Sequence, residues 1–261
     1  MNDVTSEAKG ASEGTTVCRD LYLDLLKKIL TGTLFGRQPE ATDSAAELIS
    51  HYGNRATVTG LPVRRLNHIQ SCVAEILSHD VPGDFIETGV WRGGATIFMR
   101  ALLKAHRVHN RWVWVADSFE GLPEADEKLF PNEAAFLRRE ITRDFKRLAV
   151  PIEEVKDSFA AYGMLDDQVR FLKGWFKDTL PHAPIGKLSL MRLDGDFYES
   201  TRDALTNLYD KLSVGGMVII DDYGEDDFDC RRAVDEFREQ RAIKDPLMAV
   251  DSRCYWWRRT A

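Results

Sequence analysis

The sequence has few cysteines, and none of them is spaced as a metal ligand or as a redox pair. Four cysteines occur in 261 residues. No two of them form a CxxC pair, and no group of Cys and His residues has the spacing of a zinc site. We therefore expect reduced thiols in a cytoplasmic protein. The first residues, MNDVTSEAKGASEGTT, also lack the apolar segment of a signal peptide.

Long hydrophobic runs and an excess of positive charge are missing as well. No stretch approaches the roughly 20 apolar residues that a transmembrane helix needs. Lys and Arg number 35 against 42 Asp and Glu, which gives a net charge of −7. Because nucleic-acid-binding proteins usually carry a basic surface, we expect neither a nucleic acid nor a membrane as partner. With 44% hydrophobic residues, the chain is long and apolar enough to bury a sizeable core.

The chain divides into three parts by composition and pattern. Residues 1–16 are rich in Ser, Thr, Gly and Glu, and we expect them to be flexible. Residues 17–82 form an N-terminal helical segment, with amphipathic patterns in RDLYLDLLKKIL and LPVRRLNHIQSCVAEILSHD. Residues 83–261 alternate short apolar runs with helical stretches, which predicts an α/β core with a mostly parallel sheet covered on both faces. The charged segment 126–149 interrupts this rhythm, and we interpret it as a lid insertion.

The first predicted strand of the core ends in a glycine-rich turn. GDFIETGVWRGGAT is typical of a strand, a turn and a helix, and Gly89, Gly93 and Gly94 allow the backbone to approach a ligand closely. In such sheets, ligands bind beyond the carboxyl ends of the strands. Glu87 would repel a pyrophosphate, and the glycine spacing is not GxGxxG, so the turn favours a cationic ligand over a dinucleotide. A tight turn with an incidental Glu is the alternative.

The second predicted strand also ends in an acidic residue. Asp117, in VWVADSFEG, lies about twenty residues beyond the glycine turn, where nucleotide-binding folds hold a ribose diol. A turn or helix-capping Asp is the alternative interpretation. Together, Glu87 and Asp117 on adjacent strands suit S-adenosylmethionine, which offers ribose hydroxyls, an ammonium group and a sulfonium group and carries no phosphate.

Two pairs of aspartates follow two further predicted strands. Asp194 and Asp196 come directly after LSLMRL, and Asp221 and Asp222 come directly after GGMVII. If these strands are neighbours, the carboxylates converge, and a divalent cation would relieve their mutual repulsion. Oxygen ligands without a nearby Cys or His suit Mg²⁺ or Mn²⁺. Capping of the following helices is the alternative interpretation.

The metal would orient two neighbouring oxygens of an acceptor and lower the pKa of the hydroxyl that is methylated. Asp194, Asp221 and Asp222 are the predicted ligands. Asp196 is then the remaining carboxylate, and we interpret it as the catalytic general base. In the competing interpretation, Asp196 is a ligand or a hydrogen-bonding contact.

These motifs together resemble the macrocin O-methyltransferase (TylF) family. The resemblance lies in DFIETGVWRGG, VADSFEGLP, GWFKDTLP, LDGDFYEST and KLSVGGMVIIDDYG, and it extends from about Leu61 to the C-terminus. Members of this family are S-adenosylmethionine- and Mg²⁺-dependent enzymes that methylate sugar hydroxyls on macrolide and aminocoumarin antibiotics. The resemblance implies a Rossmann-like class I methyltransferase fold, with a seven-stranded sheet in the order 3-2-1-4-5-7-6 and CYWWRR as its antiparallel strand.

The resemblance also implies which residues hold the cofactor. The loop from Glu87 to Gly94 would hold its methionine end, and Asp117 and Ser118 would hold its ribose. The GWF turn would lie near its adenine. Metal binding and proton transfer would fall to the same four aspartates as above. The predicted cofactor contacts are Glu87, Thr88, Gly89, Val90, Arg92, Gly93, Asp117, Ser118, Gly174, Trp175, Phe176 and Asp194.

The sequence thus predicts an O-methyltransferase that acts on a sugar hydroxyl of a small glycosylated natural product. The N-terminal helices are candidates for homo-oligomer contacts or for covering the substrate site, and Arg64 and Arg65 are expected on a solvated helix face. A catechol-type phenol is an alternative acceptor, because it also offers vicinal oxygens. A nucleotide-sugar oxidoreductase is a further alternative, against which Glu87 argues. A non-catalytic binding protein is another, but it would not need four converging carboxylates.

Overall fold

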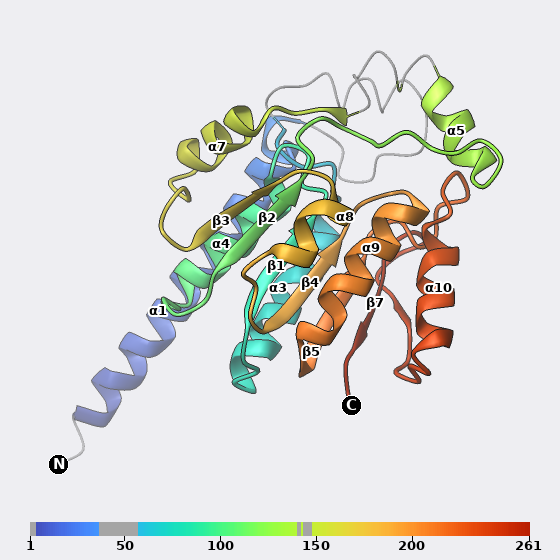
Figure 1. The fold of residues 1–261 in the computed structure, drawn as a ribbon. Helices are drawn as coiled ribbons and strands as arrows, with labels where there is room; N and C mark the ends of the chain where they lie inside the picture. The colour runs from blue at the N-terminus through green and yellow to red at the C-terminus, as the bar shows by residue number, and fades with distance from the viewer. Residues whose placement is uncertain (1–3, 37–56, 140–141, 143–147) are drawn as a thin grey trace.

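A sheet of seven strands forms the centre of the molecule, in the order β3-β2-β1-β4-β5-β7-β6, and helices cover both of its faces (Figure 1). The computed structural model describes all residues except 1–3, 37–56, 140–141 and 143–147. Strands β1 to β5 are parallel, and β7 pairs antiparallel with both β5 and β6. The predicted strand order and the antiparallel closing strand are therefore confirmed.

The strands are short, and the central ones are buried on both faces, as expected for a parallel sheet. Their bounds are β1 Asp84–Thr88, β2 Val113–Asp117, β3 Val169–Lys173, β4 Leu188–Leu193, β5 Leu212–Ile220, β6 Met248–Ala249 and β7 Tyr255–Arg258. Six of these strands coincide with apolar runs in the sequence. Strand β6 does not, because its two exposed residues show no alternation of apolar and polar side chains.

The helices alternate with the strands along most of the chain. Their bounds are α1 Val4–Leu30, α3 Val63–Ser78, α4 Gly94–Ala105, α5 Pro131–Arg138, α7 Ile152–Ala161, α8 Phe176–Thr179, α9 Tyr198–Leu208 and α10 Cys230–Gln240. Among the described residues, short 3₁₀ helices cover Thr33–Phe35, Leu180–His182 and Tyr209–Lys211. In the predicted lid, α5 is helical, while residues 140–141 and 143–147 lie outside the described residues.

Helix α1 is longer than the sequence pattern suggested. It begins at Val4, so residues 4–16 are helical where we expected a flexible segment. Helices α1 and α3 both pack against α4, so the N-terminal segment shares one core with the sheet.

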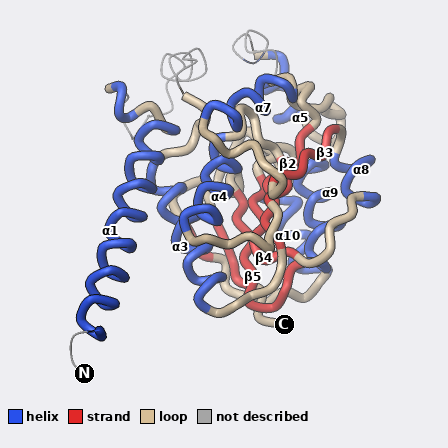
Figure 2. The backbone as a smooth tube through the Cα atoms, turned by 90° about the vertical axis from the view of Figure 1, so that its left-hand side faces the viewer, coloured by secondary structure: helices blue, strands red, loops and turns tan. Residues whose placement is uncertain are grey.

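The two faces of the sheet have separate hydrophobic cores. Successive residues of a strand point to opposite faces, so Phe85 packs on the side of α1, α3 and α4, and Ile86 packs on the side of α9 and α10. Figure 2 shows α1, α3 and α4 on one side of the strands and α8 and α9 on the other. Glu87 and its neighbour Arg192 share the face of Phe85 and Leu190. Their side chains therefore lie on the face covered by α3 and α4.

The described helices and the cysteines can be compared with what the composition led us to expect. None of the helices in the described part of the chain is both long and apolar enough to cross a membrane, and this includes α1. The cysteines form no disulfide: Cys18 is exposed, while Cys72, Cys230 and Cys254 are buried.

Candidate active site

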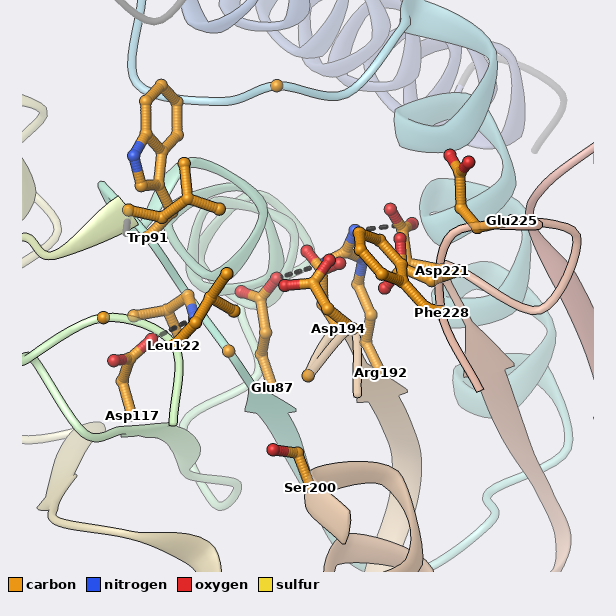
Figure 3. Close-up of a pocket in the computed structure, with 18 of the residues that line it drawn as sticks. Glu87, Trp91, Asp117, Leu122, Arg192, Asp194, Ser200, Asp221, Glu225 and Phe228 are labelled. Atoms are coloured by element: carbon orange, nitrogen blue, oxygen red, sulfur yellow. Dashed lines mark hydrogen bonds and ion pairs between the residues drawn. The ribbon is translucent and has the colours of Figure 1, made fainter. Parts of the chain in front are cut away.

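A cavity of about 990 Å³ lies at the carboxyl ends of β1, β2, β4 and β5. Pockets of roughly 300–1,000 Å³ hold drug-sized ligands, so this cavity has room for a cofactor and part of an acceptor. In Figure 3, Glu87 stands between Asp117 on one side and Asp194 with Arg192 on the other. The acidic side chains that follow four different strands, as predicted, all border this one cavity.

Most of the predicted cofactor contacts border the cavity. These are Glu87, Gly89, Val90, Asp117, Ser118, Trp175, Phe176 and Asp194. The four predicted contacts that do not border it are Thr88, Arg92, Gly93 and Gly174.

Thr88 is the last residue of β1, Arg92 belongs to the turn that follows, and neither side chain borders the cavity. Thr88 is fully buried and lies one residue beyond Glu87, so its side chain points to the opposite face of the sheet. Arg92 donates a hydrogen bond from Nη1 to the carbonyl of Thr57 at 3.0 Å, and its guanidinium lies 4.4 Å from the centre of the Trp91 ring. We therefore no longer expect either side chain to contact the cofactor.

Gly93 and Gly174 shape turns at the edge of the cavity. A Cβ on Gly93 would lie 3.0 Å from side-chain atoms of Val155 and Phe159, so the absence of a side chain lets α7 pack against this turn. Gly174 has a φ of 135°, and its amide donates a hydrogen bond to the carbonyl of Asp117 at 2.9 Å. Both residues support the turns that carry cavity residues and do not line the cavity themselves.

Gly89 and Asp117 fix the loop after β1. Gly89 has a φ of 82°, and a Cβ there would collide with the carbonyl oxygen of Asp194, so only glycine suits this position. The carboxylate of Asp117 accepts hydrogen bonds of 2.7 Å from the amides of Val90 and Phe119. Burial raises the pKa of Asp117, and these hydrogen bonds oppose the rise. Asp117 thereby holds the loop after β1 at the edge of the cavity.

Asp194, Asp221 and Asp222 meet where the neighbouring strands β4 and β5 end. One carboxylate oxygen from each lies within 4.8 Å of the other two. Oδ2 of Asp222 is buried and accepts no hydrogen bond from the described residues, while Oδ1 of Asp221 is buried 2.6 Å from the guanidinium of Arg192. Buried polar atoms normally have a hydrogen-bond partner, and carboxylate oxygens are the preferred ligands of Mg²⁺. These three residues therefore fit a divalent cation.

Asp196 borders the cavity but lies outside this group of three. Its φ of 56° is a left-handed conformation, which Asp adopts more readily than most residues. Burial, together with the charges of Asp194 and Asp221, raises the pKa of Asp196 well above its ordinary value. A carboxylate with a raised pKa accepts a proton more readily, as a general base requires.

Arg192 is a buried residue of the site that the sequence analysis missed. Only 1% of its side chain is exposed, and it forms an ion pair with Glu87. It also lies 2.8 Å from Oδ2 of Asp194 and 2.6 Å from Oδ1 of Asp221. A buried guanidinium needs such partners to offset its loss of hydration. A basic residue inside the apolar run LSLMRL, just before two aspartates, was the signal in the sequence.

Arg65 was expected on a solvated helix face, and this expectation is wrong. From α3, its Nη1 donates a hydrogen bond to Oδ2 of Asp221 at 2.7 Å. Helical periodicity separates the apolar side of α3 from its polar side, but it does not reveal that part of the polar side meets buried carboxylates. Arg65 and Arg192 are therefore the two cations that face this acidic cluster from the described elements.

The carboxylates of the site differ in how readily they lose a proton. Burial raises the pKa of Glu87 to about 7, although Arg192 and a hydrogen bond from Thr96 oppose the rise. Burial also raises the pKa of Asp222. Burial acts in the same direction on Asp221, but Arg192 and Arg65 outweigh it and lower the pKa of that group. The acidic groups of the site, which are Glu87 and the aspartates after β4 and β5, therefore outnumber the two arginines. This excess of acidic groups favours a further cation.

Aromatic side chains border another part of the cavity. Phe136 of α5 and Phe228, which precedes α10, meet edge to face with ring centres 4.9 Å apart. Phe197, directly after Asp196, lies 5.7 Å from Phe228. We call Phe136, Phe197 and Phe228 the aromatic wall. Because Phe197 adjoins Asp196 in the chain, this wall lies near the carboxylates of the site. The predicted lid thus contributes α5 to the cavity.

A buried carboxylate fixes α5 in this position. Glu133 of α5 accepts a hydrogen bond from the amide of Tyr198 at 2.7 Å and another from the amide of Asp229 at 3.2 Å. These amides lie at the N-terminal ends of α9 and α10, where helix dipoles favour a negative charge. Arg139 then forms a two-pronged ion pair with Asp227, at 2.6 and 2.7 Å.

Comparison with known proteins gives a consistent result. Residues 53–259 match the family described as Macrocin-O-methyltransferase (TylF). The chain is 49% identical over 256 residues to the 8-demethyl-8-(2,3-dimethoxy-alpha-L-rhamnosyl)-tetracenomycin-C 4'-O-methyltransferase of Streptomyces olivaceus, with 95% of each chain covered. It is 46% identical to the demethyldecarbamoylnovobiocin O-methyltransferase of Streptomyces niveus, covering 92% of this chain and 94% of that one. The solved structure of the O-methyltransferase NovP matches with a TM-score of 0.82 and 46% identity, covering 93% of this chain and all of that one.

Proposed function

The chain belongs to the macrocin O-methyltransferase (TylF) family, and from this premise we propose that it methylates a sugar hydroxyl of a small glycosylated natural product. The methyl donor is S-adenosylmethionine, and a divalent cation assists the transfer. Family membership makes the chain an O-methyltransferase. The names of its relatives, which refer to a rhamnosyl tetracenomycin and to a novobiocin precursor, support the acceptor class.

One observation carries the proposal: two sets of groups with different chemistry share a single cavity. Glu87 and Asp117 supply carboxylates beside the glycine turn, and three aspartates converge at the ends of β4 and β5. The first set suits a cationic nucleoside, and the second suits Mg²⁺ or Mn²⁺. An enzyme that joins a sulfonium methyl group to a cation-activated hydroxyl needs both sets close together.

At the cofactor end, we assign each part of S-adenosylmethionine to residues that border the cavity. Glu87 accepts the ammonium group as a further partner beside Arg192 and Thr96. Asp117 and Ser118 accept the ribose hydroxyls. Trp175 and Phe176 offer aromatic faces for the adenine. The cofactor carries no phosphate, which agrees with an acidic rather than a basic site.

At the acceptor end, Asp194, Asp221 and Asp222 would hold the cation. When bound there, Mg²⁺ would supply orientation of two neighbouring acceptor oxygens and a lower pKa for the reacting hydroxyl. Asp196 accepts the proton of that hydroxyl. In a single displacement, the acceptor oxygen forms a bond to the methyl carbon while the bond from that carbon to sulfur breaks. S-adenosylhomocysteine then leaves as a neutral thioether.

The aromatic wall supports a glycoside as acceptor. Phe136 and Phe228 present apolar surface beside the carboxylate cluster, and such surface packs well against the C–H face of a sugar or against an aglycone. A catechol-type phenol remains the alternative acceptor, and an acceptor screen distinguishes the two. Exposed apolar side chains along α1, at Val17, Leu21 and Leu25, support the prediction of a homo-oligomer.

Calorimetric titration with S-adenosylhomocysteine, with NAD as the parallel control, is the first test. We expect micromolar binding of S-adenosylhomocysteine and no binding of NAD. Glycosylated and catechol acceptors are then screened for Mg²⁺-dependent methylation. Failure to bind S-adenosylhomocysteine would contradict the cofactor assignment, and methylation of catechols alone would contradict the acceptor class.

A further inference from the structure

Asp221 differs from the other two predicted metal ligands, because an arginine approaches each of its oxygens. Arg65 Nη1 donates a hydrogen bond to Oδ2 at 2.7 Å. Arg192 Nη2 lies 2.6 Å from Oδ1, but the two groups are not aligned for a hydrogen bond. Oδ2 thus accepts a hydrogen bond from Arg65, while Oδ1 is paired with Arg192 by charge and keeps acceptor positions that a cation can share.

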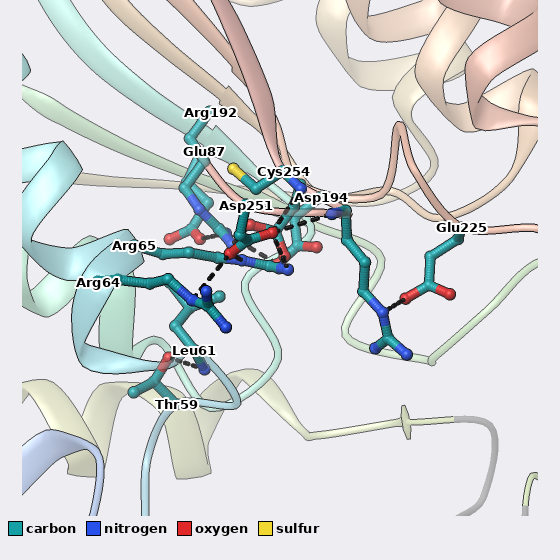
Figure 4. A network of polar contacts seen from close by, with 12 residues as sticks. Thr59, Leu61, Arg64, Arg65, Glu87, Arg192, Asp194, Glu225, Asp251 and Cys254 are labelled. Atoms are coloured by element: carbon teal, nitrogen blue, oxygen red, sulfur yellow. Dashed lines mark hydrogen bonds and ion pairs between the residues drawn. The ribbon is translucent and has the colours of Figure 1, made fainter. Parts of the chain in front are cut away.

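Arg65 is itself held in a fixed orientation by Asp251. Its Nε and Nη2 donate hydrogen bonds to the two oxygens of Asp251, at 2.8 and 3.0 Å (Figure 4). Oδ1 of Asp251 also accepts hydrogen bonds of 2.9 Å from the amides of Arg253 and Cys254. Because the guanidinium is planar and Asp251 binds one edge of it, the two N–H bonds of Nη1 have fixed directions, and one of them points toward Asp221.

These contacts connect three distant parts of the chain. Arg65 comes from α3, Asp221 follows β5, and Asp251 precedes β7, at separations of 156 and 186 residues from Arg65. The side chains are largely buried, with 12% of Arg65 and 3% of Asp251 exposed. The neighbouring Arg64 provides a contrast on the same helix: its side chain is 58% exposed, and it reaches Asp251 only at 3.5 Å.

We propose that Arg65 and Asp251 act as positioning residues for the metal site, by fixing which oxygen of Asp221 faces the cation. This inference rests on the proposed function, since it takes Asp221 as a ligand. Hydrogen bonds to metal-ligating carboxylates orient them, and loss of such a partner typically costs 10–100-fold in metal affinity. Asp251 has a second effect, because it shares the charge of Arg65 and so weakens the neutralisation of Asp221 by that charge.

Asp251→Asn tests the charge-sharing part of this proposal. The substitution keeps the shape of the side chain but leaves the full positive charge of Arg65 on Asp221, beside the cation. We expect the dissociation constant for Mn²⁺, measured by electron paramagnetic resonance on the metal-free protein without cofactor, to rise about 10-fold or more. The affinity for S-adenosylhomocysteine, measured by calorimetry, should stay unchanged, because neither residue touches Glu87 or Asp117.

Arg65→Lys tests the geometric part at constant charge. A lysine has no planar fork, so it holds Asp221 or Asp251 but not both in fixed orientation. We expect the same weakening of Mn²⁺ binding as in Asp251→Asn. Arg64→Lys is the matched control, one residue away on the same helix, and it should bind Mn²⁺ as the wild type does.

Two kinds of result would overturn the proposal. Wild-type Mn²⁺ affinity in both Asp251→Asn and Arg65→Lys would show that the pair does not position the ligand. Equal losses of Mn²⁺ binding, S-adenosylhomocysteine binding and melting temperature would show a general support of the fold instead. If the wild-type protein binds S-adenosylhomocysteine but no Mn²⁺, the metal part of the proposed function falls together with this inference. If it binds both and the variants behave as wild type, this inference falls alone.

Discussion

Replacing Asp222 with Asn should make the metal-free protein more stable while it stops methyl transfer. Asp222 is buried, and its Oδ2 accepts no hydrogen bond from the described residues. Burial and the neighbouring charges of Asp196 and Asp194 raise its pKa well above the ordinary value. Asp221, by contrast, has Arg65 and Arg192 beside it. Without a cation, the charge on Asp222 therefore opposes folding.

The size of the effect follows from the burial of this carboxylate. A buried polar group without a partner costs about 1–3 kcal/mol, and more if it is charged. Asn has nearly the same shape, carries no charge, and has an amide group that can donate to the neighbouring carboxylates. We expect a gain of about 1 kcal/mol in the free energy of unfolding, which raises the melting temperature by about 2–4 °C in a protein of this size.

Thermal unfolding in the presence of a chelator measures this gain, and methyl transfer in the presence of Mg²⁺ measures the loss of function. Asp157→Asn, on the exposed side of α7, is the matched control, and we expect it to change neither quantity. A melting temperature of Asp222→Asn at or below that of the wild type would refute the electrostatic reasoning. Full activity of this variant would refute the role of Asp222 as a ligand.

The remaining predictions concern other parts of the same site. Chelation of divalent cations should leave a cooperative unfolding transition by circular dichroism, because buried arginines already neutralise part of the carboxylate cluster. Gly89→Ala should abolish S-adenosylhomocysteine binding in calorimetry, since its Cβ would collide with the carbonyl of Asp194. Asp196→Asn should lower kcat about 10²–10⁴-fold in steady-state assays, at unchanged S-adenosylhomocysteine affinity. Burial raises the pKa of Asp251, but its hydrogen bonds with Arg65 outweigh burial and hold it at about 2. This ion pair should therefore stabilise the fold above the ordinary Asp pKa of about 4 and lose that contribution as the pH falls toward 2, which urea unfolding at several pH values measures.

Each of these predictions has an opposite result that would contradict it. Loss of the cooperative transition in chelator would show that the cation holds the fold together. Wild-type affinity of Gly89→Ala would mean that the loop after β1 adapts to a side chain. A near-normal kcat of Asp196→Asn would assign the proton to another acceptor. Identical acid sensitivity of the wild type and Asp251→Asn would show that the ion pair with Arg65 adds no stability.

The position at which each parallel strand ends could be predicted from the sequence, because each strand is a short apolar run that ends at a polar residue. Glu87, Asp117 and the aspartates after β4 and β5 all follow such runs, and parallel strands bring their carboxyl ends to one edge. The sequence therefore predicted that Asp194, Asp221 and Asp222 lie close together, and the distances between their carboxylates confirm it. The strand order came from the family resemblance and not from the strand patterns.

The partners of these carboxylates were harder to predict, because they depend on packing between distant elements. Arg65 lies on a helical face that is polar by periodicity, and only the position of α3 over the sheet turns that face toward Asp221. Arg192 is a basic residue in a buried strand, but its contacts arise from three strands in register. Thr88 ends β1 and Gly93 lies in the loop after it, yet strand alternation keeps Thr88 from the cavity and the packing of α7 keeps Gly93 from it.

The most direct test of the account is a methyl-transfer assay with demethylated glycosides, which include rhamnosylated tetracenomycin and novobiocin-type acceptors. The purified protein is incubated with S-adenosylmethionine and each acceptor, with Mg²⁺ or with a chelator, and the products are analysed by mass spectrometry. We expect the addition of one methyl group to the sugar fragment, only when Mg²⁺ is present. Methylation that is equally fast in chelator, or that falls on the aglycone, would contradict it.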